Sequence, residues 1–174
     1  MIYALVPEAR ATVVPRVIDA ASAIAGVDVV AWREDDRAVV RAPGRGELRF
    51  APGGPLRDAR GNAWSVEGDL TALAAASSDG RFDSPDYPDA LRRVWAALTC
   101  ATAGDVLLSA GPGYEFPDWG GADHVGGGSH GSLHHSDSLG AMAFCGVAAP
   151  SGIGPGAWSI TDVAPMVRAH FGAT

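Results

Sequence analysis

Apolar and polar positions in the first third of the chain switch between a helical and a strand-like period. Hydrophobic residues recur every three or four positions over residues 13–25, which predicts a helix that ends at Gly26. Short apolar runs predict strands at residues 2–6, 27–33, 37–41 and 47–50. Because the middle two runs are separated by a short acidic turn, we expect them to form a hairpin. This order of elements predicts an α+β unit, of a split βαβ type.

The pattern is less regular from residue 51 onward. Residues 51–61 are rich in Gly, Pro, Arg and Asp and are expected to form a loop. A short strand at residues 62–66 and a short helix at residues 69–76 follow. Residues 77–86 are polar and give the best internal boundary, and residues 88–98 have the apolar stripe of a helix.

The last third of the chain contains two further apolar runs. Residues 104–110 and 139–146 are expected to be buried strands on either side of a polar loop, and a final helix is expected after Ser159 or Thr161. This pattern is typical of the end of an α/β sheet, where ligand sites lie. We therefore expect an α/β fold in two domains, an α+β lobe at residues 1–86 and the end of an α/β sheet at residues 87–174.

Composition restricts the function. The chain has 174 residues, 47% of them hydrophobic, which is typical of a globular protein. A net charge of -7 argues against binding to a nucleic-acid polymer. No apolar run is long enough to span a membrane and no signal-peptide pattern is present, so the cellular location is not predicted. Cys100 and Cys145 are expected to be reduced core residues, although a single disulfide remains open.

Histidine is concentrated in one stretch, residues 119–138. Four of the five histidines lie there, among glycines and two aspartates. Glycine allows close approach of the backbone to a ligand, and neutral imidazole and carboxylate are common ligands of zinc. The stretch is therefore a candidate metal site, and the alternative is a solvated polar loop. The histidines are His124, His130, His134 and His135.

Three ordered elements near the C-terminus resemble a known family. A Gly-x-His-Gly element is followed by an apolar run that ends in glycine and by a Thr-Asp-φ-x-Pro pattern. Together they resemble the last metal-binding segment of the alkaline phosphatase superfamily, in the branch of type I phosphodiesterases and nucleotide pyrophosphatases. The resemblance covers about residues 104–172. The matching residues are Gly128, Ser129, His130 and Gly131, and then Thr161, Asp162, Val163, Ala164 and Pro165.

The resemblance implies a metal-dependent phosphoric ester hydrolase with an alkaline phosphatase-like α/β core. In this comparison residues 1–86 resemble the family's α+β variable lobe, and residues 87–174 resemble the C-terminal segment of its core. Members of that family hold two divalent ions, usually zinc, which serve phosphoryl transfer from a phosphate ester substrate to a Thr or Ser nucleophile and then to water. Only one metal ligand, His130, maps onto this chain. The family's nucleophile, its first-strand aspartate, and its Asp-x-x-x-His and Asp-His-Gly elements have no counterpart here. We therefore expect a C-terminal portion that lacks an N-terminal core segment.

The resemblance leaves this chain without a catalytic residue. Because zinc needs about four ligands and the resemblance supplies only His130, we expect this chain alone neither to bind zinc tightly nor to hydrolyse phosphate esters. One alternative is a self-contained metal-binding module that uses Asp123, His124, His130 and His134 or His135. Another is an α+β interaction module without catalysis.

Other polar side chains have simpler interpretations. His134 and His135 are both expected to be solvated or locally hydrogen-bonded, and His134 is the reserve metal candidate. Ser109 and Ser129 have no legible acid partner, which argues against a serine hydrolase. His170 is expected at the surface.

Overall fold

A computed structural model describes residues 1–117, 131–147 and 158–172 of the chain. It forms two compact units, Met1–Ser138 and Leu139–Thr174, and each is described by itself. The division follows Ser138, and residues on both sides of position 86 belong to the first unit.

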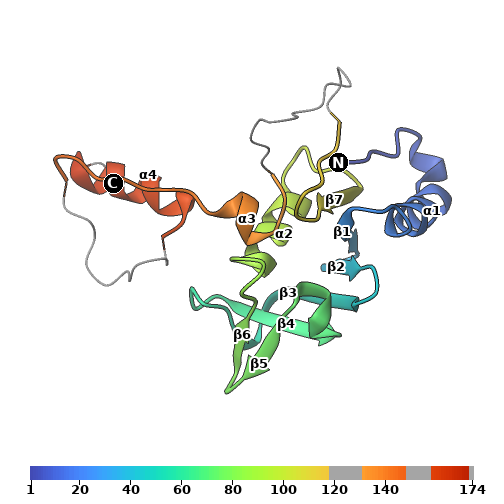
Figure 1. Cartoon of the computed structure of the whole chain (residues 1–174), viewed down its shortest axis with the longest axis horizontal. Helices are drawn as coiled ribbons and strands as arrows, with labels where there is room; N and C mark the ends of the chain where they lie inside the picture. Colours follow the sequence, from blue (N-terminus) through green and yellow to red (C-terminus); the bar gives the residue numbers. More distant parts are fainter. Residues whose placement is uncertain (118–130, 148–157, 173–174) are drawn as a thin grey trace. The chain divides into compact units, whose positions relative to one another are not determined.

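A mixed seven-stranded sheet forms the centre of the first unit (Figure 1). Its strand order is β5-β6-β3-β2-β1-β7, with β4 also paired to β3. Among the strand pairs of the described residues, only β3–β6 is parallel. The strands are β1 (Val27–Glu34), β2 (Arg37–Ala42), β3 (Gly46–Arg57), β4 (Ala63–Gly68), β5 (Ala76–Ser78), β6 (Arg81–Asp83) and β7 (Val106–Ala110).

Four α-helices accompany this sheet in the described parts of the chain, so the protein is of a mixed α and β class, as predicted. None of these helices has the length and apolar character needed to cross a bilayer. Three short 3-10 helices lie at Pro7–Ala9, Leu70–Leu73 and Ile160–Asp162. The α-helices are α1 (Arg10–Ser22), α2 (Ala90–Thr99), α3 (His135–Ser138) and α4 (Val163–His170).

The sheet is covered on both faces because its central strands are apolar on both sides. Alternate residues of a strand point to opposite faces. Val29 and Ala31 of β1 belong to a core that α2 covers with Leu91, Val94 and Leu98. Val30 and Trp32 belong to a second core, which α1 covers with Ile18 and Ala21. Burial on both faces explains why residues 27–32 form a nearly continuous apolar run.

Several predicted elements are confirmed. The helix expected near residues 13–25 is α1, the hairpin is β1–β2, the helix expected at residues 88–98 is α2, and the strand expected at residues 104–110 is β7. The expected strand at residues 2–6 is reduced to a single bridge between Ile2 and Val106.

The loop predicted at residues 51–61 is wrong over most of its length. Strand β3 continues to Arg57 and pairs with β4 across an irregularity between Pro52 and Leu56. Gly54 has a φ of 149°, and a Cβ there would lie 2.5 Å from the carbonyl oxygen of Trp64. The glycines therefore permit a bulge and a close strand approach instead of ending the strand.

The strand predicted at residues 139–146 is also wrong. The segment pairs with no strand of the described chain and belongs to the second unit. An apolar run becomes a strand only where a neighbour accepts its backbone hydrogen bonds. Cys145 lies in this segment, and both it and Cys100 are free and exposed, so the expectation of core cysteines is wrong as well.

The final helix begins as expected. The side chain of Ser159 and that of Asp162 form a capping box at the 3-10 turn before α4. The face of α4 that was expected to be buried is largely exposed, with Val163 at 41% and Val167 at 51%.

Candidate functional site

The turn of residues 131–138 is fixed to the sheet and to α2. Leu133 is buried in the core that α2 covers, and its backbone N–H donates to the Oγ of Ser109 on β7 at 2.8 Å. The guanidinium of Arg93 on α2 donates to the carbonyl oxygens of Ser132 at 3.0 Å and Leu133 at 2.8 Å. The side chains of Ser109 on β7 and Arg93 on α2 thus determine where the following two histidines lie.

Arg93 makes these bonds from a partly buried position. Burial lowers the pKa of Arg93 from its ordinary value, and the nearby charge of Asp89 acts in the opposite direction. The guanidinium is nevertheless charged at neutral pH, because arginine does not deprotonate in proteins. Its bonds to the two carbonyl oxygens are therefore charge-assisted and stronger than neutral ones.

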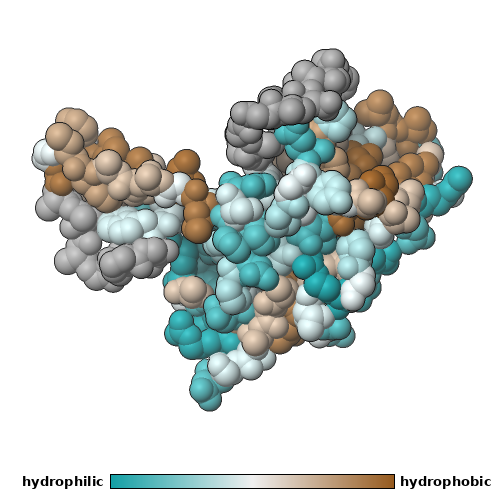
Figure 2. All heavy atoms as spheres, in the orientation of Figure 1, coloured by the Kyte–Doolittle hydropathy of each residue, from teal (hydrophilic) through white to brown (hydrophobic). Residues whose placement is uncertain are grey.

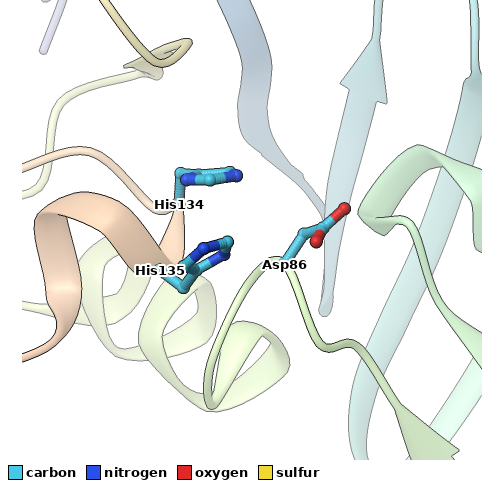
Figure 3. Close-up of side chains that lie close together, drawn as sticks. All are labelled: Asp86, His134 and His135. Atoms are coloured by element: carbon cyan, nitrogen blue, oxygen red, sulfur yellow. The ribbon is translucent and has the colours of Figure 1, made fainter.

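Two histidines and one aspartate form the candidate metal centre (Figure 3). His134 and His135 come from this turn and Asp86 comes from the segment before α2, and one ligand atom from each lies within 4.8 Å of the others. The imidazole rings are 4.2 Å apart between centroids. The backbone N–H of His135 donates to the carbonyl oxygen of Asp86 at 2.8 Å, which ties the two segments together. Figure 3 shows both rings extending toward the segment that carries Asp86.

A second polar group adjoins the histidine pair. The ring of Tyr87 meets the ring of His134 edge-on, with centroids 5.9 Å apart. The Tyr87 hydroxyl donates to Asp28 at 2.7 Å, and Asp28 also accepts from the guanidinium of Arg45 at 2.8 Å. Burial and the Asp28 carboxylate raise the pKa of Tyr87 to about 12. The phenol is thus held neutral as a donor.

The predicted site residues fall into two groups. His130, the predicted metal ligand, lies outside the described residues, as do Asp123, His124 and Ser129. His134, the reserve candidate, does lie in the cluster.

Two other sequence interpretations can be compared with the structure. The hydroxyl oxygen of Ser109 accepts a backbone hydrogen bond and has a structural role. His170 is exposed on α4, as expected. Asp86 was missed because it is far from the histidines in sequence and no spacing rule connects them.

A groove beside α1 is a weaker candidate for a functional site than the metal centre, because it is poorly suited to bind an anionic ligand. Its lining includes Arg10 and Arg41. Arg10 forms an ion pair with Asp105, and Arg41 pairs with Asp19 and Glu47. These cations are already neutralised by neighbouring carboxylates, so the groove offers little net attraction for phosphate.

Comparison with protein-family models, with curated proteins and with solved structures finds no match. The functional argument therefore depends on the residues of the chain and on their geometry. Two imidazoles and a carboxylate are a donor set typical of zinc.

Replacing Arg93 with alanine is expected to release the turn of residues 131–138. The variant leaves the carbonyl oxygens of Ser132 and Leu133 without their charged donor, at a cost of about 1.5–3 kcal/mol. Hydrogen exchange at residues 132–135 should accelerate, and denaturant unfolding should give the stability loss. Arg37→Ala is the control, since Arg37 pairs with the exposed Glu67. If residues 132–135 exchange as slowly in the Arg93→Ala variant as in the unchanged protein, Arg93 does not hold the turn.

The raised pKa of the Tyr87 phenol can be tested by spectrophotometric titration. The chain has three tyrosines, and the ordinary phenol pKa is about 10. Because the folded pKa of Tyr87 is raised, its contribution to stability is complete below about pH 10 and is lost as the pH rises toward 12. Tyr87→Phe should remove the last step of the absorbance titration, and Tyr3→Phe should retain it. A late step that survives in Tyr87→Phe would refute the assignment.

Proposed function

We propose that the chain supplies the last metal-binding segment of a metal-dependent phosphoric ester hydrolase of the phosphodiesterase, nucleotide pyrophosphatase or phosphatase type. His130 is the proposed metal ligand, and the nucleophile and the remaining ligands belong to polypeptide outside residues 1–174. The observation that carries the proposal is the conformation of the residue directly after His130.

Gly131 closes the Gly-x-His-Gly element, and its φ is 107°. A Cβ at this position would meet no atom within 4 Å among the described residues. Glycine is therefore required by the backbone conformation and not by lack of space. The last glycine of the element thus has a conformational requirement, which supports the assignment of Gly131 to the motif.

The anchored turn gives a rigid base for that loop. Gly131 directly precedes Ser132 and Leu133, which are held by Arg93 and by Ser109 near the end of β7. A ligand that leads into such a turn loses little conformational entropy on binding, which favours a preorganised metal site.

In that class of hydrolase, a bound pair of divalent ions activates the nucleophile and stabilises charge on the phosphoryl oxygens. Among the described residues, Asp86, His134 and His135 form a different donor cluster, which is not assigned to this ion pair. For the proposed reaction, the chain's own contribution is to hold His130 through the turn and to present its imidazole as a neutral nitrogen ligand.

Two features of the first unit support further polypeptide beside this chain. Strand β7 ends the sheet, and among the described residues its outer edge has only the bridge to Ile2. Exposed hydrophobic side chains gather over the N-terminal segment and α1 (Figure 2). An uncovered strand edge beside an apolar surface favours another chain segment there. The exposed residues are Met1, Tyr3, Leu5, Val6 and Val13.

The test uses the reading frame extended upstream of Met1. The extended protein should hydrolyse bis(p-nitrophenyl) phosphate, and His130→Ala should lower kcat/KM by about 100-fold or more and reduce the number of bound ions by one. Metal analysis and initial rates measure the two effects. His170→Ala is the matched control because His170 is exposed on α4.

Two results would count against the proposed function. One is an extended protein without hydrolytic activity, and the other is an active His130→Ala variant with its metal content unchanged. Residues 1–174 alone should be inactive toward the same ester.

A further inference from the structure

A metal site separate from His130 is suggested by the way in which the paired histidines are held. Both follow Leu133, whose side chain is buried and whose backbone is bonded to Ser109 and Arg93. The Oγ of Ser138 closes the turn by donating to the carbonyl oxygen of His134 at 2.7 Å. The two imidazoles are therefore presented from a fixed backbone, and both are half-buried.

The ring nitrogens of this pair are compatible with metal binding. Nδ1 of His134 lies 2.9 Å from the Oγ of Ser136. When Nδ1–H donates to this oxygen, Nε2 keeps a free lone pair, and metal-binding histidines are commonly held by such a bond at their other nitrogen. The backbone N–H of Ser136 also lies 3.2 Å from Nδ1, which is the competing arrangement without metal.

His135 supplies an independent observation. Its Nδ1 is buried and has no hydrogen-bond partner within the part of the chain that the structure describes. A buried polar atom without a partner costs free energy. Coordination of an ion by Nδ1 itself would offset part of that cost, whereas a purely structural histidine would be expected to find a donor or acceptor.

The distances between the candidate ligand atoms show that these atoms must move closer together to bind zinc. The candidate ligand atoms lie within 4.8 Å of one another. Zinc–nitrogen bonds of about 2.0–2.1 Å place tetrahedral ligands about 3.3 Å apart, so the cluster must contract. Asp86 is the exposed member, and its carboxylate can rotate toward the rings without disturbing the core. The hydrogen bond between the backbones of His135 and Asp86 already keeps the two segments in contact.

We propose that Asp86, His134 and His135 bind one zinc ion that joins the segment before α2 to the turn of residues 131–138. Three protein ligands leave the fourth tetrahedral position for water. The mixed nitrogen and oxygen donor set favours zinc over magnesium or calcium, which prefer oxygen ligands alone. The site revises the expectation that the chain alone does not bind zinc tightly, and it does not depend on the proposed hydrolytic function.

The experiment titrates zinc chloride into the full, tag-free chain by calorimetry and follows the melting temperature in parallel. One ion per chain is expected, and the Tm should rise by about 5–10 °C when free zinc is 100 times Kd. His134→Ala and His135→Ala should each weaken binding by about 10- to 100-fold or more. Asp86→Asn should also weaken binding, and because Asp86 is exposed this variant should keep the fold.

Three control variants separate this site from other histidines and aspartates. His170→Ala and Asp83→Asn change exposed residues and should leave zinc affinity unchanged. His130→Ala should also leave it unchanged, because His130 belongs to the proposed hydrolytic motif. The inference is overturned if the chain binds no zinc, if magnesium binds equally well, or if His130→Ala abolishes zinc binding while Asp86→Asn and His134→Ala do not. That last outcome leaves the proposed function standing.

Discussion

The structure around the candidate site depends on one partly buried cation, Arg93. Its guanidinium binds the carbonyl oxygens of Ser132 and Leu133, which the core side chain of Leu133 draws toward α2. A positive charge in this position is costly unless it is hydrogen-bonded, and carbonyl oxygens without a donor are costly as well. The guanidinium and the two carbonyl oxygens are each other's hydrogen-bond partners, so neither is left without one. These bonds determine the course of the chain immediately after the Gly-x-His-Gly element.

From this anchor the polar groups extend in a connected series. The turn presents His134 to the ring of Tyr87, and the Tyr87 hydroxyl binds Asp28, which also binds Arg45. Each group limits the orientation of the next, so the histidine pair lies at one end of an ordered network. A metal site built on such a network requires little rearrangement of the backbone.

Most of the sheet could be predicted from the sequence, because strands β1, β2 and β7 are apolar enough to be recognised as strands. The continuation of β3 past Pro52 could not, since glycines that permit a bulge look the same in sequence as glycines that form a loop. For the site, the histidine-rich stretch was recognisable. Asp86 was not, because its approach to His134 and His135 depends on tertiary contacts through α2.

The distribution of burial has a calorimetric consequence. Every residue classed as buried in the described chain lies in the first unit, where α1 and α2 cover the two faces of the sheet. The heat-capacity change of unfolding follows the apolar area that becomes exposed. The cooperative endotherm of this protein therefore belongs to residues 1–138, and the segment that contains α4 adds little to its enthalpy.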